Sequence, residues 1–205
     1  MLQKYGVRFS NYLLQNHIIK DTEKQTYIYG FVIFASTLLS LIFLLVLSIA
    51  INRAIWFPCF FVAFFVPRLF CGGYHAKTYH RCFLITNALF LTISALTEII
   101  LTLSITSVIP FFVLFSGIVI FLFAPIKNIN HPLSVRSQKR NRIISRVLCI
   151  IEMFLILLGY YFDINPRIII FSAISYVVVA VMMLVAIIQS KKGDEKNEKS
   201  IFESC

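Results

Sequence analysis

Cysteine and histidine side chains crowd into one short stretch of this sequence. Residues 68–82 hold two of the five cysteines, two of the four histidines and a Gly-Gly pair. A cysteine acts as a nucleophile through its thiolate, which a neighbouring base and positive charge favour. Cys82 has Arg81 beside it, and His75 is seven residues away. The stretch therefore predicts covalent catalysis with Cys82 as the nucleophile and His75 as the base.

The spacing of His75 and Cys82 requires a break in the backbone. In a continuous helix the two residues would share a face, but about 10.5 Å of helix axis would separate them. A proton transfer needs a hydrogen bond of about 3 Å. Gly72 and Gly73 tolerate sharply turned conformations. We therefore predict that residues 68–82 are not one straight helix, and that Cys82 begins the next one, where free amides favour a thiolate.

Other roles in this stretch stay open. Asn87 and backbone amides near Gly73 are candidates for a third catalytic residue and for the donors of an oxyanion hole. Zinc binding is the alternative, since a structural zinc site uses four Cys or His ligands. Its ligands would be Cys71, His75, His80 and Cys82. Close Cys-x-x-Cys or His-x-x-x-His pairs are absent from the sequence here, so catalysis is favoured and we expect no metal or other cofactor.

Composition indicates that a membrane holds these residues. The chain has 205 residues, 59% of them hydrophobic and only 14% charged, which is too little charge for a soluble globule. The formal net charge of +10 lies beside long apolar stretches, so it predicts contact with an anionic lipid bilayer and no nucleic-acid partner. The five cysteines form no even framework, which excludes a disulfide-stapled secreted domain.

Apolar stretches set the number of spans, because a helix crossing about 30 Å of hydrocarbon needs about 20 residues. Three stretches are long enough and three are shorter: 25–52, 99–126 and 168–190, then 54–67, 82–97 and 147–162. Residues 54–67 suit either a short span or a re-entrant hairpin. We predict an all-α integral membrane protein, a helical bundle of four to six transmembrane segments with an amphipathic N-terminal helix and a broken or re-entrant catalytic segment.

The distribution of basic residues predicts the orientation. Apart from Arg53 and Arg167, every Lys and Arg falls within residues 1–24, 68–82, 127–146 and 191–205. Cytoplasmic loops carry the excess of basic residues, so these four regions and both termini are expected to be cytoplasmic.

The two ends of the chain differ in character. Apolar side chains at spacings of three and four gather on one face of the first 24 residues: Leu2, Tyr5, Phe9, Tyr12 and Leu13. Such a helix lies on the inner leaflet or docks a peptide partner. Residues 191–205 form a charged tail that we expect to be disordered. Residues 1–190 are expected to form a single membrane-embedded domain.

Two acids fall within apolar stretches, where a charge is costly and often functional. Glu98 either lies at the outer turn of its span or lines a peptide or ion path. Glu152 is expected to form a salt bridge with Arg146 or Lys127 at the inner surface.

The catalytic stretch resembles one family, the AgrB family (accessory gene regulator protein B). The resemblance extends over nearly the whole chain and rests on several features: Arg68, the run Gly72-Gly73-Tyr74-His75-Ala76-Lys77, Cys82 at the family's spacing, the amphipathic amino terminus, and Ala124-Pro125 followed by a basic loop with Pro132-Leu133. The loop carries Lys127 and His131 where some relatives are richer in lysine, which bears on substrate preference.

The resemblance implies a multi-pass cysteine endopeptidase of the bacterial cell membrane, acting as a homodimer. It would remove the C-terminal tail of an AgrD-type quorum-sensing precursor peptide through a Cys82 thioester, with His75 as the base, and promote cyclisation to a thiolactone or lactone. The basic residues of 127–146 would anchor that loop to lipid or bind the acidic tail of the precursor. The rival interpretation is a small exporter of a peptide without covalent processing, although the sequence shows no internal repeat.

Overall fold

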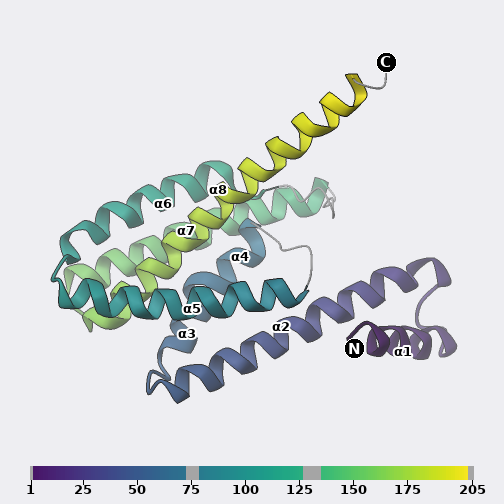
Figure 1. Ribbon diagram of the computed structural model, residues 1–205, viewed down its shortest axis with the longest axis horizontal. Coiled ribbons are helices and arrows are strands. Elements are labelled where there is room, and N and C mark those ends of the chain that lie inside the picture. The colour runs from purple at the N-terminus through teal and green to yellow at the C-terminus, as the bar shows by residue number, and fades with distance from the viewer. Residues whose placement is uncertain (1, 73–78, 127–134, 203–205) are drawn as a thin grey trace. The chain divides into compact units, whose positions relative to one another are not determined.

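The fold is entirely helical over the part of the chain that the structure describes. The computed structural model describes residues 2–72, 79–126 and 135–202, and none of these residues forms a strand. The elements in chain order are α1 (Leu2–Gln15), η1 (Asp21–Glu23), α2 (Lys24–Ala50), α3 (Trp56–Phe60), η2 (Phe61–Phe65), α4 (Val66–Cys71), α5 (Tyr79–Thr102), η3 (Thr106–Val108), α6 (Ile109–Phe123), α7 (Val135–Tyr161) and α8 (Pro166–Phe202). Figure 1 shows them as coiled ribbons.

Among the described residues, five helical segments are long and apolar enough to cross a membrane: Asp21–Ala50, His80–Thr102, Thr106–Phe123, Ser137–Tyr161 and Pro166–Gln189. A sixth apolar segment, Trp56–Cys71, is shorter. The prediction of an all-α integral membrane protein is confirmed. The boundary predicted between residues 82–97 and 99–126 lies further along the chain, because α5 continues past Glu98 to Thr102 and the turn follows, where Ser104 has a φ of 55°.

The short segment Trp56–Cys71 changes its helical pitch. The α-helical turns of α3 pass into a π-helical η2 and then into α4, with Pro67 in the first turn of α4. The ring centroids of Trp56 and Phe171 of α8 stack 4.8 Å apart. Sixteen residues reach about 24 Å as an α-helix, less than the hydrocarbon thickness of about 30 Å. The segment runs as one helix without a reversal, which favours a short span over a re-entrant hairpin.

The chain divides into two compact units, which are described separately: Met1–Ala54 with Ala76–Phe90, and Ile55–His75 with Leu91–Cys205. In the first unit α1 doubles back along the first turns of α2 (Figure 1). Gly6 permits the close approach, since a Cβ there would lie 3.2 Å from the carbonyl oxygen of Ile28. The Ser10 hydroxyl donates to the carbonyl of Lys24 at 3.3 Å, and the Phe9 and Phe31 rings stack.

The packing of α1 refines the predicted amphipathic face. Gly6 and Ser10, four residues apart, form the buried stripe, whereas Tyr5 and Tyr12 of the predicted apolar face are 55% and 62% exposed. Small residues at this spacing let two helix backbones approach closely in a membrane. The aromatic side chains thus stay available to lipid or to a partner.

In the second unit α6, α7 and α8 pack against one another, with α3, η2 and α4 beside them (Figure 1). Glycines mark the closest approaches. A Cβ on Gly117 of α6 would lie 2.7 Å from the Met153 sulfur of α7, and one on Gly159 would collide with Ile169 of α8. Helix α8 continues to Phe202, and Lys and Glu, good helix formers, are frequent in its last part.

Candidate catalytic region

The predicted break in residues 68–82 is confirmed at Gly72. Helix α4 ends at Cys71, and Gly72 follows with a φ of 74° and a ψ of −161°. A residue with a side chain rarely adopts this conformation. The Gly72 amide donates to the carbonyl of Arg68 at 3.2 Å. The Cys71 carbonyl accepts a bond of 3.0 Å from the amide of Ile126, which follows the cis Ala124–Pro125 peptide at the end of α6.

Cys82 lies where the sequence predicts it, in the first turn of the next helix. Helix α5 begins at Tyr79, which makes Cys82 its fourth residue, and the residue is partly exposed. The Thr86 hydroxyl, one turn on, donates to the Cys82 carbonyl at 3.0 Å. Amides in the first turn of a helix have no partner within the helix, and Cys82 belongs to that turn of α5.

The cysteines of the described chain differ in access. Cys71 and Cys149 are 0% and 3% exposed, so a peptide cannot reach either thiol. Cys59 is partly exposed but belongs to α3, away from any histidine in sequence. Cys82 therefore combines partial exposure with a helix start and with a basic neighbour, Arg81, which is exposed.

Some predicted site residues lie outside the described residues. His75 and Gly73 fall within residues 73–78, and Lys127 and His131 fall within residues 127–134. His80 is described and is exposed on the first turn of α5. Among the described residues no group of three or more His, Cys, Asp or Glu side chains is placed to hold a metal ion.

Asn87 is buried one turn beyond Cys82. Its amide nitrogen donates to the Phe83 carbonyl at 2.8 Å. Its side-chain oxygen Oδ1 is buried and accepts no hydrogen bond from the described residues. The Asn87 amide therefore already donates to the backbone, whereas its oxygen could still accept a hydrogen bond in an orienting role; as an oxyanion-hole donor or a third catalytic residue Asn87 stays a prediction.

The expected salt bridge between Glu152 and Arg146 does not form. Arg146 instead donates from Nε to the Phe121 carbonyl at 3.3 Å and lies 4.7 Å over the ring of the same residue. Glu152 is 6% exposed, and its Oε2 has no hydrogen-bond partner among the described residues. Arg146 reaches a nearer carbonyl on α6, which leaves the acid in the interior of the second unit.

Sequence reasoning missed a buried polar cluster next to Glu152. The Cys149 sulfur lies 2.9 Å from the Tyr176 hydroxyl and donates to the Gly117 carbonyl at 3.4 Å. Tyr176, which is fully buried, also donates to the Cys149 carbonyl at 3.3 Å. These groups come from α6, α7 and α8, so no local spacing in the sequence brings them together.

An ion pair links two helix ends in the second unit. Arg167, the second residue of α8, lies with Nε 3.3 Å from Oε1 of Glu98 on α5. Both side chains are partly exposed. Glu98, in the last turns of α5, thus has an ionic partner.

Comparison with known proteins assigns the family. The family model AgrB, accessory gene regulator B, matches residues 7–192. The chain belongs to the AgrB family. No curated protein and no solved structure matches it. The matched range includes the glycine break, His75 and Cys82, and AgrB membership supports a role in the processing of a quorum-sensing peptide.

Proposed function

We propose that this AgrB-family protein is a membrane cysteine endopeptidase that cuts an AgrD-type precursor peptide, with Cys82 as the nucleophile and His75 as the base. The observation that carries the proposal is the position of Cys82, which is partly exposed in the first turn of α5 and follows the end of helix α4 at Gly72. The same break supports the proposed role of His75, three residues beyond it. We further propose that residues 1–190 act as one peptidase domain.

The proposed reaction conserves the acyl bond energy. His75 takes the thiol proton of Cys82, and the thiolate attacks the carbonyl carbon at the cut site. As the peptide bond breaks, the protonated imidazole gives that proton to the leaving amine of the C-terminal tail, and the shortened peptide remains as a thioester on Cys82. A cysteine within the peptide then displaces Cys82 by thioester exchange and closes a thiolactone, while a serine closes a lactone. The exchange needs no ATP.

The surroundings proposed for this reaction follow from the charge pattern. The two termini and the basic residues of 127–146 would face the cytoplasm of a bacterial cell, beside anionic lipid. The precursor would lie on that leaflet, where the exposed side chains of Tyr5 and Tyr12 on α1 offer apolar contact. Two copies of the chain would assemble as a homodimer.

Co-expression with a precursor tests the proposal. Cys82→Ser and His75→Ala should abolish tail release, because one removes the thiolate and the other its base. Cys71→Ser is the matched control, since its thiol is buried, and it should cut at the parent rate. The shortened peptide should be trapped on the parent protein as an adduct that hydroxylamine releases. Parent-rate cleavage by either catalytic variant would refute the proposal.

A peptide exporter without covalent processing is the second candidate, favoured by the buried acid Glu152 at the depth of a span. Purified protein in lipid vesicles with synthetic precursor separates the two functions. The peptidase releases the tail and yields a lighter cyclic product. Movement of unchanged peptide across the vesicle membrane would instead establish the exporter.

A further inference from the structure

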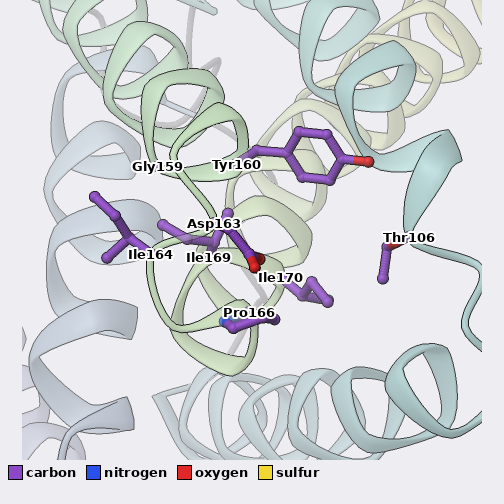
Figure 2. A pocket seen from close by; sticks show the side chains of 8 residues that line it. All are labelled: Thr106, Gly159, Tyr160, Asp163, Ile164, Pro166, Ile169 and Ile170. Carbon is purple, nitrogen blue, oxygen red and sulfur yellow. The ribbon is translucent and has the colours of Figure 1, made fainter.

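The second unit contains a cavity that the proposed peptidase does not use. It has a volume of about 250 Å³ and is lined by residues of η3, the end of α7, the turn to α8 and the first turns of α8. Water occupies about 30 Å³ in the liquid, so the cavity admits a group of several heavy atoms. Figure 2 shows its lining.

Three polar groups lie in an otherwise apolar wall. Thr106 and Tyr160 contribute hydroxyls and Asp163 a carboxylate, whereas Ile169 and Ile170 line the side of α8. Figure 2 shows the Asp163 oxygens directed between Ile170 and Pro166, with the Tyr160 ring extending toward Thr106. Convergent polar groups in a mostly apolar pocket are typical of a binding site.

The Asp163 carboxylate has no basic ion-pair partner in the described part of the chain. The nearest basic residue in sequence, Arg167, is engaged by Glu98 at 3.3 Å. Asp163 itself is exposed and makes no ion pair with a described residue. A tight turn fixes its place, with its amide donating to the Tyr160 carbonyl at 3.3 Å and its φ at 51°. The site therefore offers a negative charge beside an aromatic ring, a combination suited to an ammonium group.

The cavity lies where a lipid headgroup would lie. The candidate span Ser137–Tyr161 ends there, and Thr106–Phe123 and Pro166–Gln189 begin there. Tyr161 and Phe162, next to Asp163 in sequence, are 81% and 64% exposed. Exposed aromatic residues at the ends of spans mark the membrane interface. We propose that this cavity binds the primary ammonium headgroup of an aminophospholipid, with Asp163 as the ion-pair partner and Tyr160 as the ring beside it.

The cavity lies at the opposite end of α6 from the break at Gly72. Helix α6 has 15 residues and begins beside the cavity, so at about 1.5 Å per residue it carries the chain about 22 Å away. Beyond its far end the amide of Ile126 bonds to the Cys71 carbonyl. The proposal does not depend on the peptidase activity, and a variant at Asp163 should leave tail release unchanged.

A titration of the purified full-length protein with a short-chain phosphatidylethanolamine tests the proposal. Asp163→Asn should weaken binding about tenfold, the order expected for losing one hydrogen bond to a charged group. Asn tolerates a positive φ, so the turn should persist, and an unchanged thermal midpoint checks this. Asp21→Asn is the matched control because Asp21 is also an exposed acid, in the first unit, and it should bind as the parent does.

The chemistry of the headgroup gives the second arm. N-acetylation of the phosphatidylethanolamine, or its replacement by a short-chain phosphatidylglycerol, should cost the same factor as Asp163→Asn, and hexylamine should compete with the lipid. Equal binding of the acetylated lipid, or of the parent and Asp163→Asn, would overturn the proposal. So would a peptide with a free amino terminus that binds and is not displaced by the lipid.

Discussion

Gly72 and Cys82 show how single residues prepare the proposed site. Gly72 ends a helix in a conformation that side chains disfavour, and a Cβ there would lie 3.1 Å from the carbonyl oxygen of Ile126. Cys82 lies in the first turn of α5, as its fourth residue. Gly72 thus suits the backbone conformation that ends α4, and Cys82 lies near the start of the next helix. Cys71 cannot serve as the nucleophile, because its thiol is fully buried.

Gly72→Ala should destabilise the protein and slow tail release. The combination of positive φ and extended ψ at Gly72 costs a residue with a Cβ about 1–3 kcal/mol, and the contact with the Ile126 oxygen adds to it. Thermal unfolding in detergent and cleavage of the precursor measure the two effects. Gly30→Ala is the control, since a Cβ at Gly30 meets nothing within 4 Å. A Gly72→Ala protein with parent stability and cleavage would contradict this account of the break.

At the scale of elements, small side chains decide which helices approach closely. Gly6 and Ser10 bring α1 against α2, and Gly117 brings α6 against α7. In a membrane this packing replaces the hydrophobic driving force, because lipid is as apolar as a leucine side chain. A helix pair built this way is sensitive to one added side chain.

Gly6→Leu should separate α1 from α2. The Gly6 Cβ position already lies 3.2 Å from the Ile28 oxygen and 3.2 Å from a Val32 methyl group, so a larger side chain cannot fit without displacement. Disulfide formation between cysteines placed at Ser10 and Lys24, whose side chain and carbonyl are hydrogen-bonded, measures the contact in a background lacking the other cysteines. The yield should fall severalfold with Gly6→Leu and stay unchanged with Gly30→Ala.

At the scale of the whole molecule, the basic residues predict which ends of the spans meet the cytoplasm. Arg167 begins α8, while Lys139 and Arg142 lie in the first part of α7. The two positions are separated by the length of the span Ser137–Tyr161. The positive-inside rule therefore puts Arg167 on the outer side.

Labelling of single cysteines in intact cells should confirm this orientation. In a background lacking the native cysteines, Arg53→Cys and Ile164→Cys should react with a membrane-impermeant maleimide. Lys139→Cys should react only after the cells are opened. Labelling of Lys139→Cys from outside would contradict the predicted topology. It would also contradict the side of the membrane on which Cys82 is proposed to meet the precursor.

The sequence predicted the features that depend on local chemistry. The helical membrane fold, the break at Gly72 and the helix start before Cys82 all follow from residue type and spacing. The turn at Ser104 was missed because no charge marks it. The cluster of Cys149 and Tyr176, and the cavity at Asp163, join helices that are distant in sequence. No periodicity within one segment encodes such meetings.

The hydrogen bond between Ile126 and Cys71 joins two segments of the chain that lead into the proposed site. The Ile126 amide donates to the Cys71 carbonyl. The stretch that leads to His75 and the basic stretch that starts at Lys127 therefore follow two residues that are hydrogen-bonded to each other. If the basic stretch binds the acidic tail of a precursor, we expect tail binding and the placement of the proposed base to influence each other through this hydrogen bond.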